Sequence, residues 1–190
     1  MEKEIRSINL QDINTEMNEN ECVLKGYVNK YNTRSQDLGG FYEEIRQGAF
    51  DDSLQDNQVL ALYGHDYNKP LGRLGANLSL RSDDVGLYFE LRVNPNVTWA
   101  KDTYELVKDG VLTGMSFGFC CKDDDWNEEN GNTIRSVNKA ELFEISVVSS
   151  PAYLDSSVSC RSYKQYKEGI KTKEERELKK KQIDIELELL

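Results

Sequence analysis

Short apolar segments alternate with polar turns through residues 22–148, and this pattern limits the fold more than any other feature of the sequence. Segments of this length and composition are typical of strands rather than helices. Because many short strands follow one another closely, we expect a mostly antiparallel sheet that curls on itself like a barrel. The predicted strands are 22–28, 41–45, 59–61, 71–80, 87–93 and 142–148, with a polar turn at 81–86.

One segment, residues 99–109, has the period of a helix instead. Asn96 or Thr98 is predicted to cap its start, and Gly110 is predicted to end it in the left-handed conformation. A brief helix is expected at 51–55. Helices that cover one side of a barrel-like sheet give an α+β fold.

The acidic segment 123–132 ends in Asn130–Gly131, a pair typical of a tight hairpin turn. It lacks the alternating ligand spacing of a calcium loop, so we expect a solvated loop. A single histidine and four cysteines without a Cys-x-x-Cys spacing give no recognisable zinc set. We therefore expect no metal or cofactor, and reduced cysteines.

The charge balance limits the classes of partner. With 34 acidic and 24 basic residues the net charge is −10, which opposes binding to phosphate backbones. No apolar run approaches 18 residues and no basic-then-apolar leader is visible, so we expect neither a membrane span nor a secretory signal. The expected location is the cytoplasm, or an assembly formed there.

The composition changes at residue 162, which divides the chain into a domain at 1–161 and a charged tail at 162–190. Thr172 and Glu175 have the spacing of a capping box, which predicts a helix starting there. Alone, such a helix could not bury its apolar residues, among them Leu178. Folding back on the domain and binding a partner are both open.

Three segments could together carry acyl-transfer chemistry. Ser116 lies between Gly114 and Gly118, which can let a substrate backbone approach and leave N–H groups free for an oxyanion. His65, the only histidine, follows the apolar run 59–63. With a carboxylate from segment 141–153 they would supply nucleophile, base and orienting group. The alternative is a core strand with glycine kinks. A cysteine nucleophile at 120 or 121 lacks an electropositive setting.

At these places the sequence resembles the prohead serine proteases of tailed bacteriophages, which are related to the herpesvirus assemblins. The resemblance covers roughly residues 23–158. The matching segments, in order, are Gly26-Tyr27-Val28, residues 44–50, Gly64-His65-Asp66 with Pro70-Leu71-Gly72, Met115-Ser116-Phe117-Gly118-Phe119, and residues 142–148 with Pro151-Ala152-Tyr153.

The resemblance implies a serine endopeptidase of herpesvirus-protease-like fold with a helical tail. It would cleave scaffold segments and the major capsid protein inside the prohead, in the bacterial host cytoplasm. Ser116 would attack and His65 would be the base. Homo-oligomer formation is left open. The rival reading is a catalytically inactive capsid-assembly or scaffold-binding protein with the same fold.

The chain departs from the assemblins at the third catalytic position, where they have a second histidine. Glu144 and Glu141 are the candidates here. Because strand side chains alternate, Glu144 shares a face with Ser146, while Glu141 lies in line with apolar residues. We therefore expect Glu144 to orient His65, with Glu141 as the alternate. The assemblin arginines also have no match, since the first arginine after Glu144 is Arg161, so backbone N–H groups near Ser116 are the expected oxyanion donors.

Overall fold

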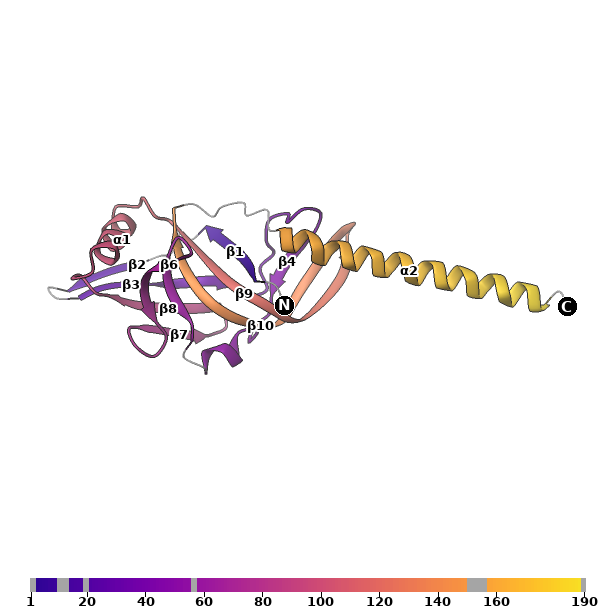
Figure 1. Ribbon diagram of the computed structural model, residues 1–190, viewed down its shortest axis with the longest axis horizontal. Coiled ribbons are helices and arrows are strands. Elements are labelled where there is room, and N and C mark those ends of the chain that lie inside the picture. Colours follow the sequence, from indigo (N-terminus) through magenta and orange to yellow (C-terminus); the bar gives the residue numbers. More distant parts are fainter. Residues whose placement is uncertain (1–2, 10–13, 19–20, 56–57, 150–156, 189–190) are drawn as a thin grey trace.

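The computed structural model describes residues 3–9, 14–18, 21–55, 58–149 and 157–188, and Figure 1 shows how its elements are arranged. The mixture of strands and helices confirms the α+β class. The strands are β1 (Glu4–Asn9), β2 (Asn14–Asn18), β3 (Glu21–Lys30), β4 (Tyr42–Ile45), β5 (Leu60–Tyr63), β6 (Asp66–Arg73), β7 (Leu78–Ser82), β8 (Gly86–Val93), β9 (Gly114–Glu129) and β10 (Asn132–Val148). The helices are α1 (Thr98–Lys108), α2 (Ser157–Glu188) and the short 3-10 helix η1 (Asp51–Leu54).

The strands that the structure describes form two sheets, so the expectation of a single sheet curled into a barrel is corrected. The larger sheet has the order β1-β9-β10-β5-β6, with β4 also paired to β10, and the smaller has the order β2-β3-β8-β7. β10 pairs antiparallel with β9 but parallel with β4 and β5. One buried apolar cluster takes side chains from both sheets, including Leu24 and Phe89 from the smaller and Phe117 and Ile145 from the larger. The two sheets therefore bury their inner faces against each other, and closure into a barrel is not needed.

Two predicted boundaries in the strands are wrong. Segment 123–132 is not a loop, because β9 continues to Glu129 and pairs with β10 along that length. Its acidic residues are tolerated in a strand because β1 pairs with β9 only at 114–119. This part of β9 is therefore a sheet edge among the described strands, and most of its acidic side chains face solvent. The hairpin turn itself is confirmed at Asn130 and Gly131, with φ of 52° and 79°. Segment 71–80 is not one strand, because Gly75, with φ of 80°, turns the chain between β6 and β7.

Helix α1 lies where the sequence predicts it and ends at Gly110, whose φ is 70°. It buries Ala100, Thr103, Tyr104 and Val107. The capping prediction is wrong, since Val97 occupies the N-cap and no side chain caps the helix.

Helix α2 begins well before the predicted capping box. Thr172 lies inside the helix, where its hydroxyl donates to the carbonyl of Glu168 at 2.9 Å. Near the start of the helix, Tyr166 stacks on Trp126 of β9 with ring centroids 4.8 Å apart. This aromatic contact attaches α2 to the far end of the β9–β10 hairpin.

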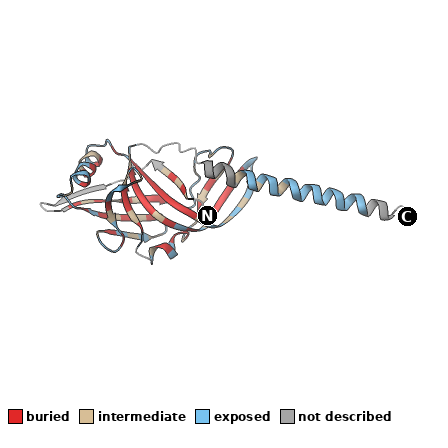
Figure 2. Cartoon of the chain, in the orientation of Figure 1, coloured by how far each residue is buried: buried red, intermediate tan, exposed pale blue. Residues whose placement is uncertain are grey.

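The rest of α2 points away from the body of the molecule (Figure 1). The described side chains from 171 to 183 are all exposed (Figure 2), including Leu178 at 62% and Ile183 at 56%. Folding back on the domain is therefore wrong for these residues. In the part of the chain described, no helix is long and apolar enough to cross a membrane.

Candidate active site

The larger sheet brings the three predicted segments together. Ser116 lies on β9, where it is opposite Ser146 of β10, and Glu144 lies opposite Gly118 in the same pairing. β5 runs parallel to β10 with Leu60 beside Glu144. The chain leaves β5 beside this part of β10, and His65 follows in the turn to β6.

His65 and Glu144 are in direct contact. The Nδ1 atom of His65 lies 2.9 Å from Oε1 of Glu144, whose side chain is fully buried. Because an ionised carboxylate only accepts hydrogen bonds, this contact puts the imidazole proton on Nδ1 and leaves Nε2 as the acceptor of a neutral ring. The contact therefore fixes the tautomer that a general base needs.

The environment of Glu144 favours its charged form. Burial raises the pKa of this carboxyl, but hydrogen bonds from His65 and Ser146 and the nearby charge of Lys3 hold the pKa below its usual value. Ser146 Oγ donates to Oε2 at 2.6 Å, and Lys3 Nζ lies 3.3 Å from Oε1. Both carboxylate oxygens are thus occupied.

The turn that carries His65 is held in an unusual conformation. Gly64 and His65 have φ of 57° and 64°, and His65 is one of the few non-glycine residues with positive φ. The left-handed region costs a residue with a side chain about 1–2 kcal/mol. The backbone N–H of His65 donates to Ser146 Oγ at 3.2 Å, and that of Gly64 donates to the Val147 carbonyl at 3.0 Å. β10 therefore holds both the backbone and the ring of His65.

Ser116 is completely buried, and its hydroxyl is engaged with β1. Ser116 Oγ donates to the backbone carbonyl of Arg6 at 2.8 Å and accepts from Ser7 Oγ at 2.8 Å. His65 Nε2 is buried and has no hydrogen-bond partner among the described residues. The structure thus joins His65 to Glu144, and places Ser116 on the neighbouring strand without a hydrogen bond to His65 among the described contacts.

Glu141 is placed differently from Glu144. Its carboxylate is 49% exposed and pairs with Lys122 Nζ at 2.6 Å. A register shift between Leu142 and Glu144 separates the two glutamates in the ladder. Glu141 therefore makes a surface ion pair, while Glu144 is the carboxylate bound to His65.

The sequence assigned no role to four residues at the site. Strand alternation placed Ser146 on the face of Glu144, but it did not identify Ser146 as a hydrogen-bond donor to that carboxylate. Lys3, Ser7 and Tyr67 gave no local signal. Lys3 Nζ donates to the hydroxyl of Tyr67 at 2.9 Å and also lies beside Glu144, so residues of β6 and of the N-terminal segment both lie next to the carboxylate.

Gly118 leaves room for the side chain of Glu144. A Cβ at this position would collide with Oε1 of Glu144 and with the Lys3 side chain. The missing side chain therefore makes room for the Glu144 carboxylate and for Lys3.

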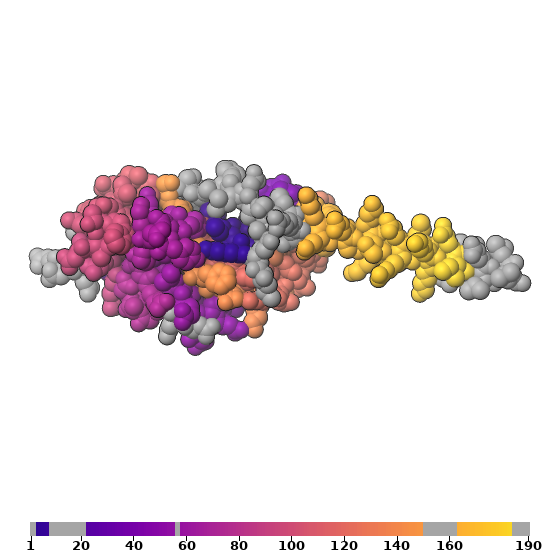
Figure 3. Space-filling model, in the orientation of Figure 1, coloured from indigo at the N-terminus to yellow at the C-terminus, as the bar shows by residue number. Residues whose placement is uncertain are grey.

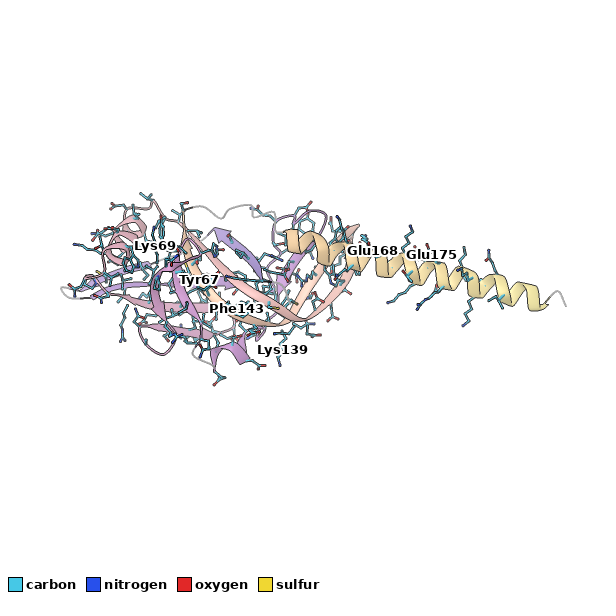
Figure 4. All side chains as sticks on the ribbon, in the orientation of Figure 1. Tyr67, Lys69, Lys139, Phe143, Glu168 and Glu175 are labelled. Carbon is cyan, nitrogen blue, oxygen red and sulfur yellow. The ribbon has the colours of Figure 1, made fainter. Side chains whose placement is uncertain are left out.

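A cavity of about 260 Å³ lies close to the site, lined among others by Leu60, Tyr67, Leu142 and Phe143. Figure 4 labels Tyr67 on β6 and Phe143 on β10. Leu60 is the ladder neighbour of Glu144, so this cavity adjoins the row of residues that holds the carboxylate.

The possible metal ligands and the thiols of the described residues are placed as follows. No group of three or more histidine, cysteine or acidic residues in the described ranges could hold a metal ion. Cys22, Cys120 and Cys121 are free thiols. Burial raises the pKa of Cys121 to about 12, so its thiol stays protonated near neutral pH. The side chain of Cys160 lies outside the described set.

Comparisons with known proteins identify relatives of this chain. The family model of the caudovirus prohead serine proteases matches residues 9–169. The prohead protease of Escherichia phage T5 is 30% identical over 150 residues, which cover 78% of this chain and 67% of the relative. That of Enterobacteria phage HK97 is 29% identical over 134 residues, or 68% of this chain and 56% of the relative.

A solved structure, that of the bacteriophage T4 capsid assembly protease gp21, has a similar fold. The TM-score is 0.51 at 10% identity, and the match covers 78% of this chain and 98% of the other. At this identity the likeness concerns the fold alone.

Proposed function

This chain belongs to the family of caudovirus prohead serine proteases, and from that membership we propose that Ser116, His65 and Glu144 are its catalytic triad. The observation that carries the proposal is the 2.9 Å contact between His65 Nδ1 and the buried Glu144 carboxylate. No second carboxylate among the described residues contacts His65, and Glu141 is paired with Lys122 instead. The family supports this reading over a non-enzymatic assembly protein.

The reaction would be peptide hydrolysis through an acyl-enzyme. Ser116 Oγ attacks the scissile carbonyl carbon while His65 Nε2 takes its proton, and the same nitrogen then donates that proton to the leaving amine. Water, deprotonated by His65, releases the acyl group and restores the serine. Glu144 stabilises the imidazolium in both halves. Backbone N–H groups of β9 beside Ser116 are the proposed oxyanion donors.

The proposed substrates are scaffold segments and the major capsid protein. The relatives are named as prohead proteases and the solved neighbour as a capsid assembly protease. We accordingly place the reaction inside the immature capsid in the host cell.

The test is co-expression with the capsid protein of the same phage, followed by intact-mass analysis of both chains. Ser116→Ala should lower processing by roughly 10³- to 10⁶-fold while the protein stays folded. Ser79→Ala is the matched control, because Ser79 is an exposed residue of β7 in the other sheet. Normal trimming by the Ser116→Ala variant would show that another residue is the nucleophile.

A further inference from the structure

Strand β1 lies where an extended substrate would have to lie. It pairs antiparallel with β9 from Glu4 opposite Phe119 to Asn9 opposite Gly114, which puts Ser7 directly opposite Ser116. β1 is an edge strand of the larger sheet, and Figure 3 shows it, in indigo, at one face of the molecule. We propose that β1 occupies the peptide-binding edge of β9 and must leave that edge before Ser116 can react. This inference rests on the proposed function.

The hydrogen bonds of Ser116 support this inference. Its proton points to the Arg6 carbonyl oxygen, 2.8 Å away, and Ser7 donates to the same hydroxyl. For catalysis the proton must instead point to a base, and a substrate carbonyl must come within contact of Oγ. The buried Nε2 of His65, which has no hydrogen-bond partner among the described residues, is the atom that would accept this proton. β1 thus holds the Ser116 hydroxyl in hydrogen bonds that do not involve His65.

The position of β1 at the edge makes its replacement feasible. Among the strands that the structure describes, only β9 pairs with it, so its departure leaves the order β9-β10-β5-β6 intact. It would expose the N–H and C=O groups of β9 between Gly114 and Phe119, which form a ready template for another extended peptide. A substrate strand can then restore the lost main-chain hydrogen bonds next to Ser116.

The buried charged residues around β1 can separate into two groups, one on β1 and one on the body of the protein, and each group keeps charges of both signs. Arg6 contacts Glu43 at 2.7 Å and Arg135 contacts Glu4 at 2.7 Å, which ties the strand to the body. Within the strand, however, Arg6 also contacts Glu4 at 2.6 Å. In the body, Arg135 keeps Glu43 at 3.0 Å and Asp124 at 2.6 Å. Removal of β1 therefore leaves no buried charge of this cluster without a partner of opposite sign. An unpaired buried charge is what makes breaking a buried ion pair costly.

The test measures how fast a small serine-reactive phosphonate labels Ser116 in the full chain, by intact mass and peptide mapping. Arg6→Ala removes the contact with Glu43 and should raise the labelling rate by about tenfold or more, because the reactive form becomes more populated. A synthetic peptide of residues 3–9 added to that variant should slow labelling again, and a scrambled peptide should not. Arg92→Ala is the matched control, since Arg92 is exposed on β8, and its rate should not change.

A folded Arg6→Ala variant that is labelled no faster than the unaltered protein would overturn the inference. Should that variant fail to fold, hydrogen exchange of the unaltered protein decides, because the amides of β1 must then exchange faster than those of β10. Equal exchange in the two strands would also overturn it. Labelling of a residue other than Ser116, or unchanged labelling in Ser116→Ala, would instead refute the proposed function, on which the inference about β1 rests.

Discussion

Replacing Glu144 by glutamine tests the candidate site most directly. Glutamine keeps the size of the side chain and can still accept from His65 Nδ1, which lies 2.9 Å away, so the buried packing need not change. It removes the negative charge that faces the imidazolium in the transition state. At an effective dielectric constant of about 20, two unit charges at this distance interact by about 6 kcal/mol. An amide dipole recovers part of that energy.

The expected result is a loss of about 3–5 kcal/mol of transition-state stabilisation, or about 10²- to 10⁴-fold in kcat/KM. The assay is hydrolysis of a capsid-derived peptide, with melting temperatures to show that both variants are folded. Glu141→Gln is the matched control, because its exposed pair with Lys122 belongs to a class worth about 0–1 kcal/mol and its loss should change the rate by less than about fivefold. Equal losses in the two variants, or the reverse ranking, would refute the assignment of Glu144.

Four further results are expected. His65→Ala should remove peptide hydrolysis while the protein stays folded, as shown by its melting temperature, whereas full hydrolysis in that variant would exclude His65 as the base. Ser146→Ala should lower kcat by about tenfold or more with little change in KM, because Glu144 Oε2 and the His65 N–H lose their partner; Ser146→Thr should recover part of the rate, and an unchanged kcat would remove Ser146 from the site. For Glu4, burial raises the pKa, but hydrogen bonds and charges of Arg135 and Arg6 bring it below the usual 4.5. Its stabilising contribution is therefore complete above that pH and lost as the pH falls through the lower folded value, so urea unfolding should show a weaker acid dependence in Glu4→Gln. Truncation after Gly169 should reduce entry into the shell more than hydrolysis of a short peptide, and equal losses would contradict this.

The sequence could identify the parts of the site that local patterns carry. The alternation along 141–148 predicts that Glu144 lies on the face of Ser146. In the structure, the Ser146 hydroxyl donates to the Glu144 carboxylate. The cover of Ser116 by β1 could not be found in this way. Ser7 and Ser116 are separated by 109 residues, and nothing in a short polar segment specifies which strand it will pair with.

Errors in the fold have similar causes. The pair Thr172 and Glu175 has the spacing of a capping box, but that signal is local, and the helix had already begun at Ser157. The composition of the acidic run 123–129 predicts a loop, because aspartate has a weak strand propensity. At this solvent-exposed sheet edge, pairing with β10 outweighs that propensity.

Helix α2 also sets a distance scale for the whole molecule. From Glu168, near its last contact with the hairpin, to Glu188 the helix rises by about 30 Å at roughly 1.5 Å per residue. A partner molecule bound to the distal end of this helix would have a high local concentration of the protease around it. The surface of that partner would stay clear of the catalytic residues. Recruitment and cleavage would then be separate properties, which shortening or lengthening the helix by whole turns could tune one against the other.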